Sequence, residues 1–335
     1  MERINWIDWA KATAITMVVF GHIPENPDNF LIGYICTFHM PLFFFISGYL
    51  TKKRNDIQIN IYKYWHSLII PYFLYNTIFY PYWFIRYFLE HGGVLSFSDM
   101  VIKPALGVLF GQIETSISYT VSGVTWFLLA LLLMRIIVDW CNNHKKRILL
   151  MTIASFTIAF IYISSEYYNI MNNLLMKGFT RCFPFFVLGH LLQHKQRYAV
   201  TNFYTLAAVT LLFYTTSITL YLLTKQSDSF CIRILSSYSI SLMAIIAVLS
   251  TCKFLNSHTS NVLVNISNGT IMIMGLHWMC IGVTNFLLES LFGVIEIRYE
   301  WYTAVFISIS IITFIYPIIV ISKNHIPILL GKITA

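Results

Sequence analysis

The chain is 335 residues long, with 57% hydrophobic, 17% aromatic and only 11% charged residues, and its mean hydropathy is +0.69. Soluble domains carry about 25% charged residues, so the 22 basic and 14 acidic residues could not cover a water-facing surface of ordinary polarity. This composition excludes a soluble protein and predicts a chain embedded in a lipid bilayer. A spanning helix takes about 20 apolar residues, so about ten of them leave no room for a separate soluble domain.

Long apolar runs bounded by charged residues, Pro or Asn predict ten spanning helices. In chain order they cover residues 6–23, 31–50, 66–88, 124–141, 149–164, 179–193, 202–223, 233–251, 268–289 and 301–321. The predicted fold class is all-α, a polytopic integral membrane protein in which residues 1–335 form a single transmembrane domain.

Basic residues indicate how these helices are oriented, because Lys and Arg in short loops stay on the cytoplasmic side. With the N-terminus inside, 13 of the 22 Lys and Arg residues fall in cytoplasmic loops and 5 in outer loops. Both termini are therefore expected in the cytoplasm, and the net charge of +8 reflects orientation, with no nucleic-acid partner. The longest connection, 91–123, falls outside, and its apolar stretch 100–110 is expected to be interfacial or re-entrant. The six cysteines lack disulfide or metal-site spacing, so no metal is expected.

Polar residues of the first predicted helix fall on one face. Asp8, Lys11 and His22 follow helical spacing, and Lys11 and His22 lie about 16 Å apart along the helix axis. Asp8 and Lys11 can neutralise each other as i, i+3 neighbours. Ionisable side chains inside a membrane usually face a polar interior, which makes this stripe a candidate site. The alternative is that Lys11 extends to the headgroups and His22 caps a helix end.

The second predicted helix contains His39, Pro41 and the small pair Ser47–Gly48. Pro41 lets the helix bend, and the small pair lets another helix approach closely. His39 lies near the same outer surface as His22, so the two imidazoles are expected to face one pocket. Histidine is the commonest general base, because its pKa lies close to the operating pH. The alternative is a structural role for each imidazole.

The first fifty residues carry a specific set of motifs. They are Asp8-x-x-Lys11, the Lys11-x10-His22 spacing, Gly21-His22, and Phe38-His39-Met-Pro-Leu-Phe-Phe-Phe-Ile-Ser-Gly-Tyr49. Together they resemble the membrane-bound acyltransferase family 3, and within it the branch of fucose 4-O-acetylase-like enzymes.

Weaker similarity continues to the end of the chain. It lies in Thr125-Trp126-Phe127-Leu128, in Arg181 to Gly189, and in Ile271 to His277. Where many members of the family open the third span with Arg-x-x-Arg, this chain has Lys63-Tyr-Trp-His66. The donor site there is therefore less well defined.

The resemblance implies a single acyltransferase domain that transfers an acyl group, usually acetyl, to a hydroxyl of a surface polysaccharide or lipid-linked glycan. The implied donor is cytosolic acyl-CoA, usually acetyl-CoA. It acts as a co-substrate and not as a permanently bound cofactor. The other expected partners are the carbohydrate acceptor and membrane lipids, and the expected location is the bacterial cytoplasmic membrane.

The residue types agree with this chemistry. A sugar hydroxyl needs a base within hydrogen-bond reach, and we assign this role to His22, with supporting roles for Asp8, Lys11 and His39. CoA phosphates need fixed positive charge on the cytosolic side. Candidates for donor binding are Lys11, Lys63, His66 and Arg181, with the pantetheine arm following the stripe toward His22. Candidates for acceptor binding are Trp126 and His277.

Two other classes of function remain open at this stage. In a carrier or flippase, the same polar stripe would line a path for a lipid-linked sugar. In a non-catalytic subunit of a polysaccharide assembly complex, the histidines would be incidental. Lys63 as an ordinary loop charge and Trp126 as an interfacial tryptophan are the corresponding structural alternatives.

Overall fold

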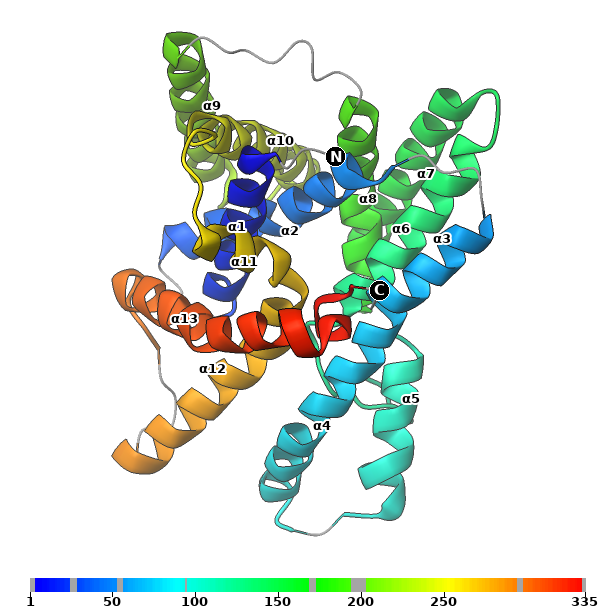
Figure 1. Cartoon of the computed structure of the whole chain (residues 1–335), viewed down its shortest axis with the longest axis vertical. Coiled ribbons are helices and arrows are strands. Elements are labelled where there is room, and N and C mark those ends of the chain that lie inside the picture. The colour runs from blue at the N-terminus through cyan, green and yellow to red at the C-terminus, as the bar shows by residue number, and fades with distance from the viewer. Residues whose placement is uncertain are drawn as a thin grey trace.

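The computed structural model describes residues 4–24, 29–52, 57–93, 95–168, 173–193, 203–293 and 298–332, and all regular structure in these ranges is helical (Figure 1). The elements are α1 (Asn5–Phe20), α2 (Phe30–Leu50), α3 (Ile57–Tyr64), the π-helical turn η1 (Trp65–Ile69), α4 (Ile70–Glu90), the π-helical turn η2 (Ser98–Ile102), α5 (Lys103–Leu109), α6 (Trp126–Asn142), α7 (Arg147–Tyr167), α8 (Leu174–Leu192), α9 (Phe203–Thr224), α10 (Phe230–Phe254), α11 (Asn261–Asn268), α12 (Thr270–Phe292), α13 (Trp301–His325) and the 3-10 turn η4 (Pro327–Leu330). This confirms the all-α class for the described residues.

Each predicted span overlaps one long helix. Among the described helices, six are long and apolar enough to cross a membrane, namely α2, α7, α9, α10, α12 and α13. The chain is therefore consistent with a membrane protein, while ten crossings and two cytoplasmic termini stay predictions. Helix α8 starts at Leu174 rather than at residue 179, because the side chain of Asn173 caps it by accepting a hydrogen bond from the Leu175 amide.

The backbones of helices α2 and α8 approach each other closely in the core. A Cβ placed on Gly48 of α2 would lie 2.0 Å from the carbonyl oxygen of Phe186, and one on Gly189 of α8 would lie 2.1 Å from that of Phe45. Only glycine allows two helix backbones to approach this closely. The close approach predicted for Ser47–Gly48 is therefore present, and its partner is α8.

Helices α4 and α12 run parallel and in register. The ring of Tyr75 fills the space beside Gly275, and Tyr82 fills the space beside Gly282. Figure 1 shows the later halves of both helices extending away from the rest of the bundle. Because α3, η1 and α4 follow one another without a break, this continuous helix is about 50 Å long, more than the roughly 30 Å of a bilayer's hydrocarbon core.

The long connection after α4 folds back against that helix. Its apolar stretch forms η2 and α5, held by hydrogen bonds from Tyr80 OH to the Met100 carbonyl and from Tyr72 OH to the Val108 carbonyl, each 2.5 Å long. Gln112, buried and with a positive φ of 68°, accepts hydrogen bonds from the Val121 and Ser122 amides. The segment expected to be interfacial or re-entrant is thus a short packed helix beside α4.

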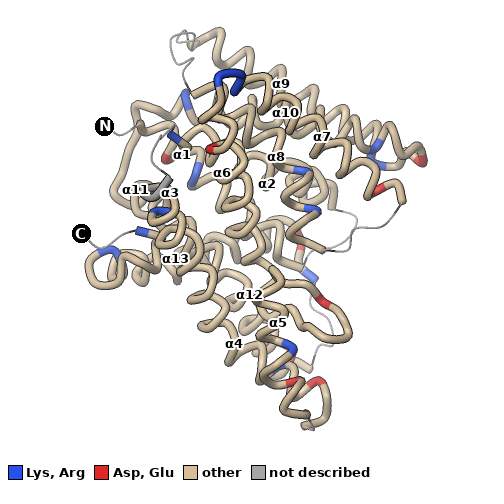
Figure 2. The backbone as a smooth tube through the Cα atoms, turned by 90° about the vertical axis from the view of Figure 1, so that its right-hand side faces the viewer, with Lys and Arg blue, Asp and Glu red and all other residues tan. Residues whose placement is uncertain are grey.

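Several helix ends that the basic residues predict to lie on the cytoplasmic side contact one another. His190 near the end of α8 contacts the Thr51 carbonyl after α2, at 3.0 Å, and the Asn142 side chain at the end of α6. Asn256 after α10 accepts a hydrogen bond from the Trp6 amide at the start of α1. Figure 2 shows most Lys, Arg, Asp and Glu residues near the ends of helices, as expected for helices whose middle sections face lipid.

Candidate active site

His22 lies in the turn that ends α1. The Gly21 amide donates to the Met17 carbonyl, 2.9 Å, and the Nδ1 of His22 lies 2.7 Å from the Val18 carbonyl. Because a carbonyl oxygen only accepts hydrogen bonds, Nδ1 carries the proton in this contact. The neutral ring therefore keeps its lone pair on Nε2, the atom required of a general base.

The imidazole next to His22 is that of His277 on α12. The Nε2 of His277 lies 3.4 Å from the Nδ1 of His22, and the ring centroids are 5.0 Å apart. His277 is fully buried, and its own Nδ1 donates to the Ile273 carbonyl at 2.9 Å. Its Nε2 is therefore an acceptor that faces the protonated nitrogen of His22. Together with the shorter contact to the Val18 carbonyl, this contact fixes the orientation of the His22 ring.

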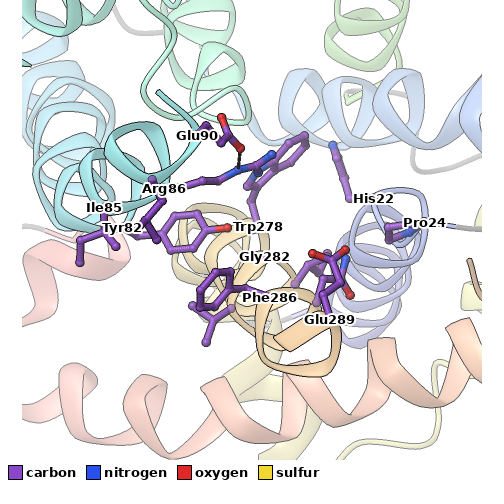
Figure 3. A pocket seen from close by; sticks show the side chains of 14 residues that line it. His22, Pro24, Tyr82, Ile85, Arg86, Glu90, Trp278, Gly282, Phe286 and Glu289 are labelled. Carbon is purple, nitrogen blue, oxygen red and sulfur yellow. Dashed lines mark hydrogen bonds and ion pairs between the residues drawn. The ribbon is translucent and has the colours of Figure 1, made fainter. Parts of the chain in front are cut away.

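A cavity of about 630 Å³ adjoins His22. Its walls come from the end of α1, the last turns of α4 and the second half of α12. Trp278 of α12 packs against His22, with ring centroids 5.2 Å apart, and 37% of its surface is exposed. Figure 3 shows His22 and Trp278 on one side of this space and Tyr82 of α4 facing it.

The same cavity has charged walls. Arg86 and Glu90 of α4 form an ion pair with a 2.7 Å separation. Glu289 of α12 also lines the cavity, and within the described part of the chain no ion pair neutralises it. A volume of several hundred Å³ with aromatic walls and a few polar groups is typical of a small-molecule site.

The register of α4 and α12 shows how deep the two imidazoles lie. Since Gly275 is level with Tyr75 and Gly282 with Tyr82, His277 is level with Thr77. The helix rises about 1.5 Å per residue, so His66 lies about 16 Å toward one end and Glu90 about 20 Å toward the other. The candidate base thus lies between the predicted donor cations and the outer rim of the cavity.

The comparisons with known proteins agree with an enzyme of this kind. A family model described as an acyltransferase domain (Acyl_transf_3) matches residues 4–322, nearly the whole chain. The chain belongs to this acyltransferase family. No curated protein and no solved structure matches it. The family predicted from the motifs is thereby confirmed, whereas the fucose 4-O-acetylase-like branch stays a prediction.

Two further predicted residues of the acyltransferase lie between packed helices. His39 is buried, and its Nδ1 donates to the Ile35 carbonyl of the same helix, at 3.0 Å. The guanidinium of Arg181 donates to the Thr37 carbonyl, at 2.8 Å, and to Ser237 of α10, at 3.3 Å. Neither side chain is part of the described cavity walls. Arg181 therefore ties α8 to α2 and α10, on the level of His39.

Lys63 and His66 lie at the end of α3 and in η1, away from the cavity. The Nδ1 of His66 donates to the Tyr62 carbonyl, at 2.8 Å, and its ring packs on that of Tyr62. Tyr64, between them in sequence, donates to Asp139 of α6. They lie far from His22, as expected if the acyl donor enters from the side opposite the cavity. Their donor-binding role stays a prediction.

The stripe from Asp8 to His22 passes through the packed core. Asp8 accepts a hydrogen bond from Ser267 of α11, at 2.5 Å, and Lys11 is half-buried. Three residues of the stripe, Ile15, Val18 and Val19, are fully buried. The face of α1 along which the pantetheine arm is predicted to run is therefore filled by neighbouring side chains in the described conformation.

The two predicted acceptor residues are not among the described walls of this cavity, so their acceptor-binding role stays a prediction. Trp126 packs on α8, where a Cβ on Gly178 would come within 2.1 Å of its ring, and it is not part of the described cavity walls. His277 contacts His22 from behind and does not face the cavity. The aromatic side chain that does occupy the cavity wall beside His22 is Trp278.

Sequence reasoning did not single out Arg86, Glu90, Glu289 or Trp278. Arg86 and Glu90 have ordinary i, i+4 spacing, and Trp278 is one of eight tryptophans in the chain. Glu289 offered the clearest signal, since it is an isolated acid at the end of a long apolar run. In the described residues no three His, Cys, Asp or Glu side chains come together as metal ligands would.

An ion pair stabilises the connection between α4 and α6, beside α4. Lys103 and Asp99 lie 2.8 Å apart, and Tyr119 donates to Asp99, at 3.0 Å. Hydrogen bonds from Lys103, Ser96 and Tyr119 hold the pKa of the Asp99 carboxyl well below its usual range. The hydrogen bond to Asp99 raises the pKa of Lys103. Both groups are therefore charged at neutral pH, and they stabilise the loop that covers α4.

Proposed function

We propose that this acyltransferase transfers an acyl group, acetyl in the simplest case, from cytosolic acyl-CoA to a hydroxyl of a carbohydrate in a bacterial cytoplasmic membrane. The observation that carries the proposal is the tautomer of His22. Its Nδ1–H is held by the Val18 carbonyl, and its Nε2 is left as a base beside a cavity large enough for a sugar ring.

The proposed reaction is direct. Nε2 of His22 takes the proton from the acceptor hydroxyl while the hydroxyl oxygen attacks the thioester carbonyl. The carbon–sulfur bond breaks, the ester remains on the sugar, and the CoA thiolate receives the proton from the His22 imidazolium. The Nε2 of His277 is a second, more distant acceptor beside the Val18 carbonyl, 3.4 Å from the Nδ1 of His22, and helps to hold the ring in this orientation during transfer.

The arrangement along α4 supports two-sided access. Lys63 and His66 lie toward one end of the continuous helix, and the cavity rim with Arg86 and Glu90 lies toward the other. His22 and His277 lie between them, within about 16–20 Å of each. An acyl-CoA bound by the cations and a sugar in the cavity would therefore approach the base from opposite sides.

The test is acyl transfer by the purified chain with labelled acetyl-CoA and a panel of glycans. We expect His22→Ala to lower transfer by about 10²–10⁴-fold. The control is His144→Ala, which removes an exposed histidine after α6. Both variants should retain the wild-type unfolding midpoint. Retained transfer by His22→Ala refutes the proposal, and movement of glycan across the membrane without label indicates a carrier instead.

A further inference from the structure

We infer that the charges of the cavity select an acceptor sugar without net negative charge, with Glu289 as the specificity-determining residue and Trp278 as the stacking surface. This inference rests on the proposed function, because it takes the cavity beside His22 as the acceptor site. It goes beyond that function by naming the chemical class of the sugar: a neutral or amine-bearing ring rather than a uronic acid or a phosphorylated sugar.

The first step is the balance of charge. Arg86 is neutralised by Glu90 at 2.7 Å, and His22 is neutral when it acts as a base. Among the wall residues that the structure describes, Glu289 then leaves one net negative charge. Carboxylates accept hydrogen bonds from sugar hydroxyls and pair with ammonium groups, but they repel other anions.

The second step is the size of the effect. The cavity walls extend along α12 from Trp278 to Glu289, about 16 Å, so a charge on a sugar that lies between these two residues is roughly 8–12 Å from Glu289. At that distance, in a partly wet site, one unit of repulsion weakens binding by about tenfold. The same repulsion acts on the phosphates of CoA, which favours donor entry from the side of Lys63 and His66.

The third step is the position of Trp278. Its indole packs against the His22 ring and is partly exposed to the cavity. The apolar face of a sugar ring binds flat aromatic surfaces, which would hold a ring hydroxyl next to His22. Figure 3 shows Trp278 close to His22, whereas Glu289 lies eleven residues further along α12, about 16 Å along the helix axis, so a sugar ring that contacts His22 and Trp278 is affected by Glu289 through its charge.

The experiment titrates the purified full chain with three methyl glycosides that differ only in charge. They are the neutral glucoside, the cationic glucosaminide and the anionic glucuronide, each followed by saturation-transfer NMR up to about 100 mM, the weak-binding range expected of single sugars. We expect the glucuronide to bind about tenfold more weakly than the glucoside, and the glucosaminide to bind at least as tightly.

Variants assign this preference to Glu289. Glu289→Gln should bring the glucuronide and the glucoside to similar affinity, whereas Glu289→Asp should keep the preference. The matched control is Glu166→Gln, which removes a carboxylate from the Glu166–Lys177 pair outside the described cavity walls. This control changes the net charge of the chain equally and should leave the preference unchanged.

Each outcome decides between the inference and its failure. Equal affinity for glucoside and glucuronide in the wild type, an unchanged preference in Glu289→Gln, or no saturation transfer from any sugar overturns it. His22-dependent turnover of acetyl-CoA is measured separately. If turnover depends on His22 but charge preference is absent, only this inference fails; if preference is present but turnover ignores His22, the proposed function fails and the sugar site remains.

Discussion

The contact between α2 and α8 makes a quantitative prediction for Gly48→Ala. The new Cβ would lie 2.0 Å from the Phe186 carbonyl oxygen and 2.8 Å from its carbon, whereas ordinary van der Waals contacts begin at 3.4 Å. Because the obstructing atoms belong to a helix backbone, they cannot rotate away. The two helices would have to separate by about 1 Å, a gap that forfeits a quarter to a half of each affected dispersion contact.

The size of the loss follows from the number of contacts. If about 40 atom pairs near the crossing each contribute about 0.1–0.2 kcal/mol, the loss is about 1–4 kcal/mol. Alanine has a higher helix propensity than glycine, which stabilises the folded variant by about 1 kcal/mol. The net cost is then up to about 3 kcal/mol, in the range of other overpacked cores.

The assay follows buried thiols during heating of the detergent-solubilised chain. Cys141, Cys182 and Cys252 are free and buried, so a thiol-reactive dye reports unfolding. We expect the midpoint of Gly48→Ala to fall by roughly 1–4 °C, because an unfolding entropy of about 0.7 kcal/mol/K for a chain of 335 residues converts the cost into this shift. The control is Gly123→Ala, whose new Cβ would meet nothing closer than Thr120 at 3.9 Å. A wild-type midpoint for Gly48→Ala would refute the reasoning.

Two further predictions concern the base and the outer connection. His277→Ala removes the second acceptor that faces Nδ1 of His22, and we expect acyl transfer to fall about tenfold. Because His277 is fully buried, the cavity left by Ala should also lower the unfolding midpoint, so rates are compared well below that midpoint. Partial recovery of the rate is expected in His277→Gln, and an unaltered rate would contradict the positioning role. The second variant is Asp99→Asn. In the wild type, hydrogen bonds hold the pKa of the folded Asp99 carboxyl below its unfolded value of about 3.9. The charged carboxyl therefore stabilises the fold above about pH 3.9, and this contribution is lost as the pH falls toward the folded pKa. The difference in unfolding midpoint between wild type and variant should therefore stay constant from about pH 8 to 5 and shrink below about pH 4; a difference that grows on acidification is the contrary result.

The sequence by itself determined where the helices lie and which family the chain joins. Apolar runs of about 20 residues have few alternatives to a helix in a membrane, so each of the ten predicted spans overlaps one long helix, whereas the short helices α3 and α5 lie outside them. Short motifs around His22 and His39 led to the acyltransferase family, which the family match confirms. The small pair containing Gly48 likewise predicted a close helix contact, which the structure contains.

Only the tertiary structure decided which faces of these helices meet. A helix that is apolar all round carries no pattern that distinguishes its lipid-facing side from its packed side, so the neighbour of His22 could not be read from spacing. His277 is 255 positions away along the chain, and the cavity walls come from the far ends of α4 and α12. Such contacts depend on where Gly275 and Gly282 admit Tyr75 and Tyr82, and that fit between surfaces exists only after the helices have packed.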